Sequence, residues 1–488
     1  MGIVASIKNA FSKSKPKKSN SIIPFNQFIR NLRASYDSAS TNDLNSKHWS
    51  YSDGLSADSA LSSSVRKKIR ERARYETENN TYAKGMLNTL SDNVIGIGPR
   101  LQLLTPDSKF NSTVELAFTE WMRAVSLADK LRLMQKTRVR DGEVFFVYQQ
   151  NPKIDNAIKT ELILIECDRV TDPEFNLESE NDIDGVFIDD FGNPVKYRIL
   201  KHHPGSNIFS MGIEYNDFKA ENIIHHFKTE RPEQHRGLSE ISSALPLYAL
   251  LRRLTLATIY AAENAAEHAG VLSTPMPAES DPSDVDSDSG MAGLPFETVG
   301  VEYNGLTIMP DGYTLQQYKA EHPNSRYSEF KREILNEISR CLSIPRNVAQ
   351  GDSSGYNYAS GRLDHQVYFK KIRVEQDWIG RTVLDRILSN WHWEYSTMNG
   401  FSVKQPIPHQ WFWDGSEHVD PLKEAKAQET RLNSRTTTYA AEFAKQGQDW
   451  EEQFEQVARE KTKMQELGIT PVDLNNKQEP EEDDDEEK

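Results

Sequence analysis

The sequence predicts an α+β protein that is mainly helical. Apolar residues recur at helical spacing over long segments, as in 326–343 and 363–395. Two other stretches, EVFFVYQ (143–149) and TELILIEC (160–167), have the β-branched and aromatic content of strands, with a polar turn between them. The 488 residues are enough for roughly two to four domains or sub-domains.

The first half of the chain combines a polar arm with an α+β region. Residues 1–60 are rich in Ser, Lys and Asn and show little periodicity, which predicts a mostly disordered arm. Helices are expected from Ser64 to Asn93, where GIGPR ends the pattern, and from Val114 to Ala124. After the two strands, DGVFIDDFGNPVKYRIL (184–200) indicates a hairpin with its turn at Asp190–Pro194.

The next segment is expected to be a long helix from Leu238 to Leu272, with Pro246 marking a break or a late start. Alanine is abundant over 256–272, which suits close packing against neighbours or other copies, although an ordinary core helix would carry the same pattern. The Pro-, Ser- and Asp-rich stretch 273–295 then predicts a flexible excursion. VGVEYNGLTIMP (299–310) follows as a predicted hairpin with an Asn-Gly turn.

Helices dominate the remaining sequence. A helix is expected from Arg326 to Ser343, and Pro345 would end it. GDSSGYNYASGR (351–362) then interrupts helical structure with a polar loop that carries glycine and tyrosine. Further helices are expected over Leu363–Tyr395 and Pro421–Glu466, and the C-terminal EPEEDDDEEK is expected to be a solvated acidic tail.

Composition excludes several classes of protein. The net charge is −15, and two cysteines, Cys167 and Cys341, rule out a disulfide framework and are expected to be buried thiols. The most apolar stretch, 244–262, is split by Arg252 and Arg253, so no membrane-spanning segment is expected. The first residues fit a short myristoylation pattern, but we favour a disordered basic arm.

No motif in the sequence indicates catalysis. The acidic stretch that begins at Asp284 lacks the Gly and Glu of an EF-hand, and GIGPRL lacks the third glycine of a dinucleotide fingerprint. The sequence has no P-loop, no HExxH and no Gly-x-Ser-x-Gly. The pairs His202–His203 and His225–His226 do not have the i, i+4 spacing of helical metal ligands. We therefore expect no enzyme activity, no metal and no cofactor.

Over roughly residues 60–470 the chain resembles the lambda-type family of tailed-bacteriophage portal proteins. The most specific matching blocks are RPEQHRG (231–237) and YNYASGR (356–362), and a longer one is RARYETENNTYAKGMLNTLSDNVIGIGPRLQ (72–102). The resemblance implies a ring, expected to be a dodecamer, at one capsid vertex. It further implies that double-stranded DNA is packaged and ejected through this head-tail connector.

The resemblance also divides the chain into the regions of a portal fold. They would be a disordered N-terminal arm (1–60), an α+β wing (61–240), a stem helix (241–273), a clip (274–322), a second stem helix (323–343), a tunnel loop (344–361), a wing segment with a long helix (362–430), a crown (431–468) and an acidic disordered tail (469–488).

Particular residues acquire roles through the same resemblance. The tunnel loop would face DNA and slide along it without sequence preference, whereas ordinary connector residues are the alternative. Arg362 would anchor a neighbouring carboxylate rather than DNA. The residues expected to face DNA are Gly351, Asp352, Ser353, Ser354, Gly355, Tyr356 and Asn357. Those expected to pack between subunits in the stem are Ala261, Ala262, Ala265, Ala266 and Ala269.

The implied partners are those of a portal vertex. They are other copies of the chain, DNA, the terminase large subunit, major capsid and scaffold proteins, and head-completion or neck proteins, with no membrane. The implied location is the capsid portal vertex of the virion, with the host cytoplasm during assembly. Two alternatives stay open: an enzyme with an unrecognised active site acting on capsid or nucleic acid, and a monomeric adaptor.

Overall fold

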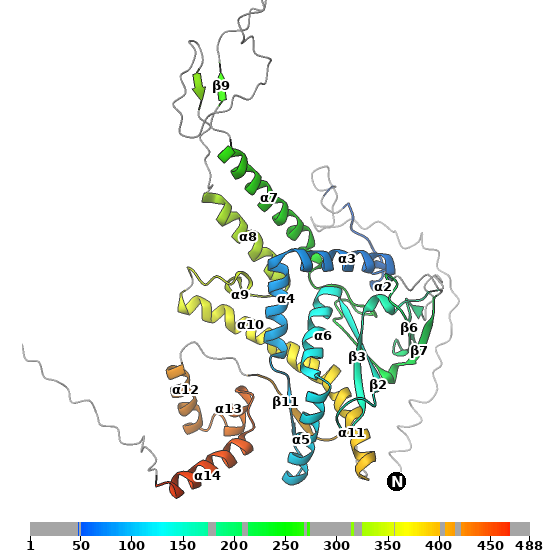
Figure 1. The fold of residues 1–488 in the computed structure, drawn as a ribbon, viewed down its shortest axis with the longest axis vertical. Coiled ribbons are helices and arrows are strands. Elements are labelled where there is room, and N and C mark those ends of the chain that lie inside the picture. The colour runs from blue at the N-terminus through cyan, green and yellow to red at the C-terminus, as the bar shows by residue number, and fades with distance from the viewer. Residues whose placement is uncertain are drawn as a thin grey trace, which may run out of the picture. The chain divides into compact units, whose positions relative to one another are not determined.

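The computed structural model divides the chain into two units, Met1–Ser56 and Ala57–Lys488. In the first unit the described residues include a turn at 50–51. The second unit holds all the helices and strands discussed below (Figure 1). The structure describes residues 47, 50–173, 182–206, 213–267, 271–273, 314–316, 325–355, 357–400, 406–414 and 421–468.

Helices make up most of the described part of the chain, which agrees with the predicted mainly helical α+β class. The α-helices are α2 (Ala57–Ala60), α3 (Ser63–Asn79), α4 (Thr81–Ile95), α5 (Ser108–Ala124), α6 (Leu127–Asp141), α7 (Leu245–Glu267), α8 (Ser325–Cys341), α9 (Arg346–Gln350), α10 (Tyr358–Ile379), α11 (Asp385–Asn399), α12 (Pro421–Asn433), α13 (Tyr439–Lys445) and α14 (Trp450–Glu466). The strands are β1 (Arg100–Leu103), β2 (Glu143–Gln150), β3 (Thr160–Ile165), β4 (Asp182–Ile183), β5 (Val186–Ile188), β6 (Pro194–Leu200), β7 (Tyr215–Lys219), β8 (Ile223–Phe227), β9 (Val271–Ser273), β10 (Thr314–Gln316) and β11 (His409–Phe412).

The first predicted helix is in fact two helices, α3 and α4, that meet at Asn80. This residue has extended backbone (φ −120°, ψ 116°), and its side-chain oxygen accepts hydrogen bonds from the amides of Tyr82 and Ala83. Asn is among the best N-cap residues because it satisfies amides that have no partner within the helix. The prediction of one helix from Ser64 to Asn93 was therefore wrong at this point, although the GIGPR stop is confirmed by the end of α4 at Ile95.

The predicted strands are confirmed, and they belong to two antiparallel sheets. The three-stranded sheet has the order β3-β2-β8, and the four-stranded sheet has the order β4-β5-β6-β7. Strand β2 is central in its sheet, pairing with β3 on one side and β8 on the other. The hairpin predicted over 184–200 is present as the antiparallel pair β5 and β6. Two short sheets, β1-β11 and β10-β9, pair segments that are far apart in the sequence.

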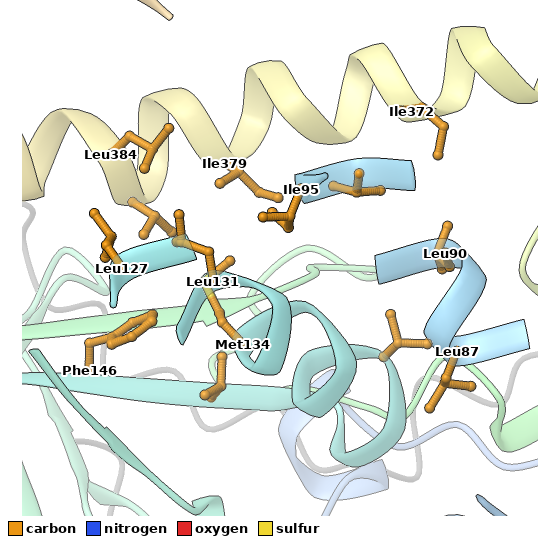
Figure 2. Close-up of a cluster of buried hydrophobic side chains, with 14 of the residues drawn as sticks. Leu87, Leu90, Ile95, Leu127, Leu131, Met134, Phe146, Ile372, Ile379 and Leu384 are labelled. Carbon is orange, nitrogen blue, oxygen red and sulfur yellow. The ribbon is translucent and has the colours of Figure 1, made fainter. Parts of the chain in front are cut away.

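Alternation along β2 places its side chains in two separate cores. Phe146 belongs to the larger core, which lies between β2 and the helices α4, α6 and α10 (Figure 2). Phe145 and Val147 point to the opposite face and pack in a smaller core with residues of β5, β6 and β8. A central strand buried on both faces explains why EVFFVYQ is apolar almost throughout.

Helix α7 begins later than predicted and ends earlier. A 3₁₀ turn at Ser242–Ala244 precedes it, and Pro246 occupies its first turn, where a missing amide costs no hydrogen bond. Residues 271–273 form strand β9, antiparallel to β10, instead of continuing the helix. The segment between these two strands contains the acidic excursion and the predicted hairpin at 299–310, and both lie outside the described residues.

The region around Pro345 also differs from the prediction. Helix α8 ends at Cys341, and Ser343 takes a left-handed backbone (φ 50°), so Pro345 is the N-cap of α9 and does not end α8. Helix α10 begins at Tyr358, inside the segment predicted as loop. It continues through a π-helical turn, Gly380–Leu384, into α11. The predicted second long helix is therefore confirmed, but it starts earlier than Leu363.

The C-terminal helical segment is divided into three helices, not one. Turns with left-handed backbone at Arg435 (φ 55°) and Gly447 (φ 70°) separate α12, α13 and α14. The predicted single helix over Pro421–Glu466 was wrong, because SRTTT and the Gln-Gly-Gln sequence are turn signals within it. The predicted tail 469–488 and most of the predicted arm 1–60 lie outside the described residues, and residues 57–60 of that arm form α2.

Candidate tunnel loop and stem surfaces

Helices α7 and α8 pack against each other, and one end of the pair is joined to the α+β body that contains β2 and β6 (Figure 1). Tyr248 and Leu251 of α7 are buried, whereas the side chains further along the helix become exposed. Arg252 pairs with Glu76 of α3 at 3.2 Å, and the Tyr327 hydroxyl of α8 donates to Thr255 at 3.1 Å. The body thus holds the first turns of α7, and contacts with α8 support the following turns.

The predicted stem alanines extend along the part of α7 that projects from the body. Ala261 and Ala262 are exposed, so they are available for contact with another subunit. Ala265 and Ala266 lie within α7, and Ala269 lies outside the described residues. Large apolar side chains on the same helix are also exposed, among them Leu256 at 48% and Tyr260 at 56%. Exposed apolar side chains on a helix of this kind indicate a surface that a partner covers.

Within the predicted tunnel loop (344–361), polar contacts hold both ends of the segment 351–357, which carries the residues expected to face DNA. At its start, the Gln350 side chain donates to the backbone carbonyl of Arg332 in α8 (3.1 Å). Asn347 of α9 lies 3.0 Å from His365 of α10, so the two flanking helices are also joined to each other. At the end of the loop, Asn357 caps α10 by accepting from the Ser360 amide at 2.8 Å. The loop therefore projects from fixed ends.

The loop residues between these anchors are exposed. Gly351 and Gly355 have positive φ angles of 65° and 78°, which favour glycine, and no atom lies within 4 Å of a Cβ built at either position. The predicted DNA-facing residues 351–355 and 357 all have exposed side chains or backbone, and Tyr356 lies outside the described residues. The structure thus brings these described residues together in one short exposed segment between α9 and α10.

Asp352 gives the loop a local negative charge. Its carboxylate accepts from the Ser354 amide at 2.8 Å. Hydrogen bonds from the side chain and backbone of Ser354 lower the pKa of Asp352, and the charges of Arg346 and Arg332 lower it further. The ionised form of this exposed carboxylate is therefore favoured by Ser354 first and by the two arginines second.

The RPEQHRG block runs from the surface, where Arg231, Pro232 and Glu233 are exposed, into the interior at Arg236 and Gly237, and it has a structural role that the sequence did not reveal. Arg236 is 1% exposed and forms hydrogen bonds to both carboxylate oxygens of Glu143, which is fully buried. The Gln234 side chain accepts from the amides of Glu230 and Arg231 and donates to the Arg236 carbonyl. The block therefore folds on itself and places Arg236 against Glu143, the first residue of β2.

Two glycines, Gly142 and Gly237, allow the two backbone segments to approach closely enough for this ion pair. A Cβ on Gly237 would lie 2.2 Å from the carbonyl oxygen of Gly142, and a Cβ on Gly142 would lie 2.5 Å from the carbonyl carbon of Leu238. The Gly237 amide also donates to Glu143 at 3.0 Å. Glycine is therefore required at both positions, because any side chain there would separate the two backbone segments.

Electrostatics in this interior site favour an ionised carboxylate. Burial opposes ionisation of Glu143, but the charge of Arg236 and hydrogen bonds from His225 and Arg236 hold its pKa well below the usual range. Burial also lowers the pKa of His225, with Glu143 opposing this shift. Cys167 is a buried thiol as predicted, and burial raises its pKa, whereas Cys341 is only partly buried, so the prediction of a buried thiol was wrong there.

One group in the described part of the chain has the residue types of a metal site. Glu166, Asp168 and His203 present ligand atoms within 4.8 Å of one another. Asp168, however, is already paired with Arg70 at 3.0 Å and with Arg74 at 2.6 Å. His203 accepts the Gly205 amide at Nδ1, so a neutral ring carries its proton on Nε2, which faces Glu166 at 3.2 Å. These contacts suit an ion-pair network better than a cation.

Comparison with known proteins places the chain in a class of virion proteins, the portals. Residues 45–376 match the family described as "Phage portal protein, lambda family". This match spans more than half of the chain, and the chain belongs to the lambda family of phage portal proteins. The family that the sequence resembles is thereby confirmed.

Three relatives carry the same description. The probable portal protein of Halomonas phage phiHAP-1 is 26% identical over 429 residues, covering 82% of this chain and 81% of the relative. Portal protein B of Escherichia phage lambda is 21% identical over 370 residues, covering 68% of each chain. The portal protein of Escherichia phage N15 is 21% identical over 451 residues, covering 80% of this chain and 83% of the relative.

Similar solved structures come from gene transfer agent (GTA) particles. A chain from the virion of the native particle covers 78% of this chain, at 12% identity and a TM-score of 0.44, and 93% of its own length is covered. A chain from the neck of the native particle, computed with C12 symmetry, covers 77% at 14% identity and a TM-score of 0.43, with 92% of its own length covered.

Proposed function

We propose that the chain forms a ring, a dodecamer, at one capsid vertex, and that double-stranded DNA enters and leaves through the ring. The match of residues 45–376 to the portal family carries this proposal. The projecting pair α7 and α8 supports it, because exposed apolar and alanine side chains on a helix suit a partner of the same kind. A ring of identical chains closes through head-to-tail contacts.

Imaging of the purified chain tests the ring. Negative-stain images together with native mass should show closed rings with a central hole. A chain that stays monomeric at every concentration would overturn the ring proposal and favour the adaptor. Robust nucleotide or nucleic-acid turnover by contaminant-free protein would favour the enzyme alternative, whereas we expect the motor to supply the ATPase.

We assign the portal regions to the structure on this basis. The α+β body that contains β2 and β6 would be the wing, together with α10, α11 and the segment to 430. Helices α7 and α8 would be the stem, the 274–322 segment the clip, and residues 431–468 the crown. The terminase large subunit and the neck or head-completion proteins would meet the clip. Major capsid and scaffold proteins would surround the ring during assembly in the host cytoplasm, before its incorporation into the virion.

The loop Gly351–Asn357 would face DNA in the channel. Its exposed residues and its fixed ends support this role, because a short exposed segment between anchored helices can touch a moving backbone without holding it. DNA that must slide is poorly served by many lysine and arginine contacts, since each phosphate contact adds affinity by counterion release. The chain's net charge of −15 agrees with weak, non-specific contact.

A shortened loop tests the contact with DNA. Deletion of Gly351–Tyr356 should leave ring assembly intact while the length of packaged DNA, or its retention, falls. A matched variant, Ser353→Ala with Ser354→Ala, keeps the loop length and should package normally. Normal filling by the deletion variant would refute the role in DNA contact. Loss of rings would show instead that the loop is part of the subunit interface.

A further inference from the structure

Helix α10 carries an apolar stripe on its outer face. Leu363, Val367 and Val374 are 65%, 64% and 62% exposed, and Lys370 lies between them on the same face. Their spacing of four, three and four residues keeps them in line along the helix. The stripe covers about 16 Å, at 1.5 Å per residue.

The same helix buries a different face in the body. Tyr368, Ile372 and Ile379 belong to the larger core, and they lie on the side of α10 opposite the stripe. A helix at the surface of a monomer normally shows polar residues on its outer face. Single exposed apolar residues need no explanation, but three in line on a helix that is already anchored indicate a covered surface.

A cavity adjoins the far end of this stripe. It has a volume of about 330 Å³ and lies between the end of β8 and α10. Val374 belongs both to the stripe and to the cavity wall, so the two form one continuous surface. The lining residues are Phe227, Lys228, Thr229, Val374, Glu375 and Trp378.

A buried group of charged residues contacts the cavity wall through Glu375 and Trp378. Arg138 pairs with Glu375 at 2.8 Å and with Glu240, and its guanidinium lies 5.1 Å from the centre of the Trp378 ring. Burial lowers the pKa of Lys371, although the charges of Glu240 and Glu375 oppose this shift. With Lys228, three cations therefore face two carboxylates.

Lys228 is the member of this group that reaches the mouth of the cavity. Its Nζ lies 3.7 Å from Glu240, which is too long for a hydrogen bond, and 45% of its side chain is exposed. An ammonium group has three donors and prefers a carboxylate partner. The mouth of the cavity is therefore suited to an incoming acidic side chain beside apolar walls.

We propose that a second copy of this chain covers the α10 stripe, closes the cavity and places a carboxylate against Lys228. This inference rests on the proposed ring and identifies one of its interfaces. A second copy is favoured because the chain is acidic, with a net charge of −15, while Lys228 at the cavity wall is a half-exposed cation that lies too far from Glu240 for a hydrogen bond. In a head-to-tail ring the stripe meets a different surface of the neighbour, so it need not complement itself.

Two substitutions test the proposal, one on the stripe and one in the cavity. Val367→Asp places a charge where the neighbour would bury it, and we expect the protein concentration at half assembly to rise roughly tenfold or more. Leu116→Asp on α5, where Leu116 is 61% exposed, is the matched control. This substitution should change the protein concentration at half assembly by less than about twofold. Mass photometry over a dilution series measures the fraction in rings, and circular dichroism melting of the dissociated subunits checks their fold.

Salt dependence provides the second readout. Lys228→Met should weaken rings at low salt and flatten their dependence on salt concentration, because it removes one screened charge contact. Val374→Asp repeats the stripe test at the cavity wall if Val367→Asp impairs folding.

Each outcome separates this interface from the ring itself. If the wild-type chain forms rings and the stripe variants form them equally well, the proposed interface is wrong while the ring stands. The stripe would then be assigned to a different protein. Equal loss of rings in Leu116→Asp and Val367→Asp would also overturn the proposed interface, because a charge at an exposed apolar site outside the stripe would then have the same effect. A wild-type chain that never forms rings would overturn the ring and the interface together.

Discussion

Replacing Arg236 by methionine should destabilise the body strongly. The substitution removes hydrogen bonds of 3.1, 3.0 and 2.6 Å from the guanidinium to Glu143, together with donors to the carbonyls of Asp184 and Val170. Glu143 is fully buried, so its charge keeps weaker support from His225, the Gly237 amide and Arg70, whose guanidinium lies 3.9 Å away. Breaking one side of a buried ion pair costs about 3–5 kcal/mol.

The assay is urea unfolding at neutral pH, followed by far-UV circular dichroism. Arg381→Met is the matched control, because Arg381 pairs with Asp377 at 2.8 Å while 67% of its side chain is exposed. An exposed pair of this kind contributes about 0–1 kcal/mol. The double variant Arg236→Met with Glu143→Met should recover part of the loss, since no buried charge then lacks its partner. If Arg236→Met cost no more than Arg381→Met, the role assigned to the buried pair would be wrong.

Three further outcomes are expected. Gly237→Ala should lower the melting midpoint by several degrees, because its Cβ would lie 2.2 Å from the Gly142 carbonyl oxygen, whereas Gly400→Ala, with open space around it, should cost only the strain of its positive φ. Burial, with the charge of Arg138, holds the pKa of His226 well below its usual value, so the stability of the wild-type protein should fall as the pH drops below about 6.5. In thermal melts, the melting midpoint of His226→Phe should fall less between pH 7.5 and pH 5.5 than that of the wild type. Ala262→Glu should shift native mass toward single subunits without changing their melting midpoint, and unchanged rings would exclude close packing at that exposed site.

Local sequence signals were sufficient for most elements. The apolar and aromatic runs of β2 and β3 specify strands because a buried strand needs no polar face, and the early proline places the start of α7. The break at Asn80 was missed because the apolar spacing continues across it, so only the capping side chain marks the boundary. The same limit applies to the turns at Arg435 and Gly447, where left-handed backbone interrupts an otherwise helical composition.

The interior ion pairs could not be predicted from the sequence. Arg236 and Glu143 are separated by 93 residues, and their pairing depends on glycines that let two backbone segments meet. The sequence contains 73 acidic and 58 basic residues, so charge alone does not identify which of them are buried. For the loop 351–357 the sequence predicted its exposure, but the anchors at Gln350 and His365 depend on contacts between helices.

The buried pair between Arg138 and Glu375 joins residues that are 237 positions apart in the chain. Ribosomes add about 5–20 residues per second, so Arg138 waits roughly 12–50 s during synthesis before its partner exists. Helix α6 and β2 cannot close their side of the core in that interval, because the covering helix α10 has not yet been made. The larger core therefore closes only after α10 has been synthesised, and the stripe and the cavity become available to a neighbour no earlier than this step.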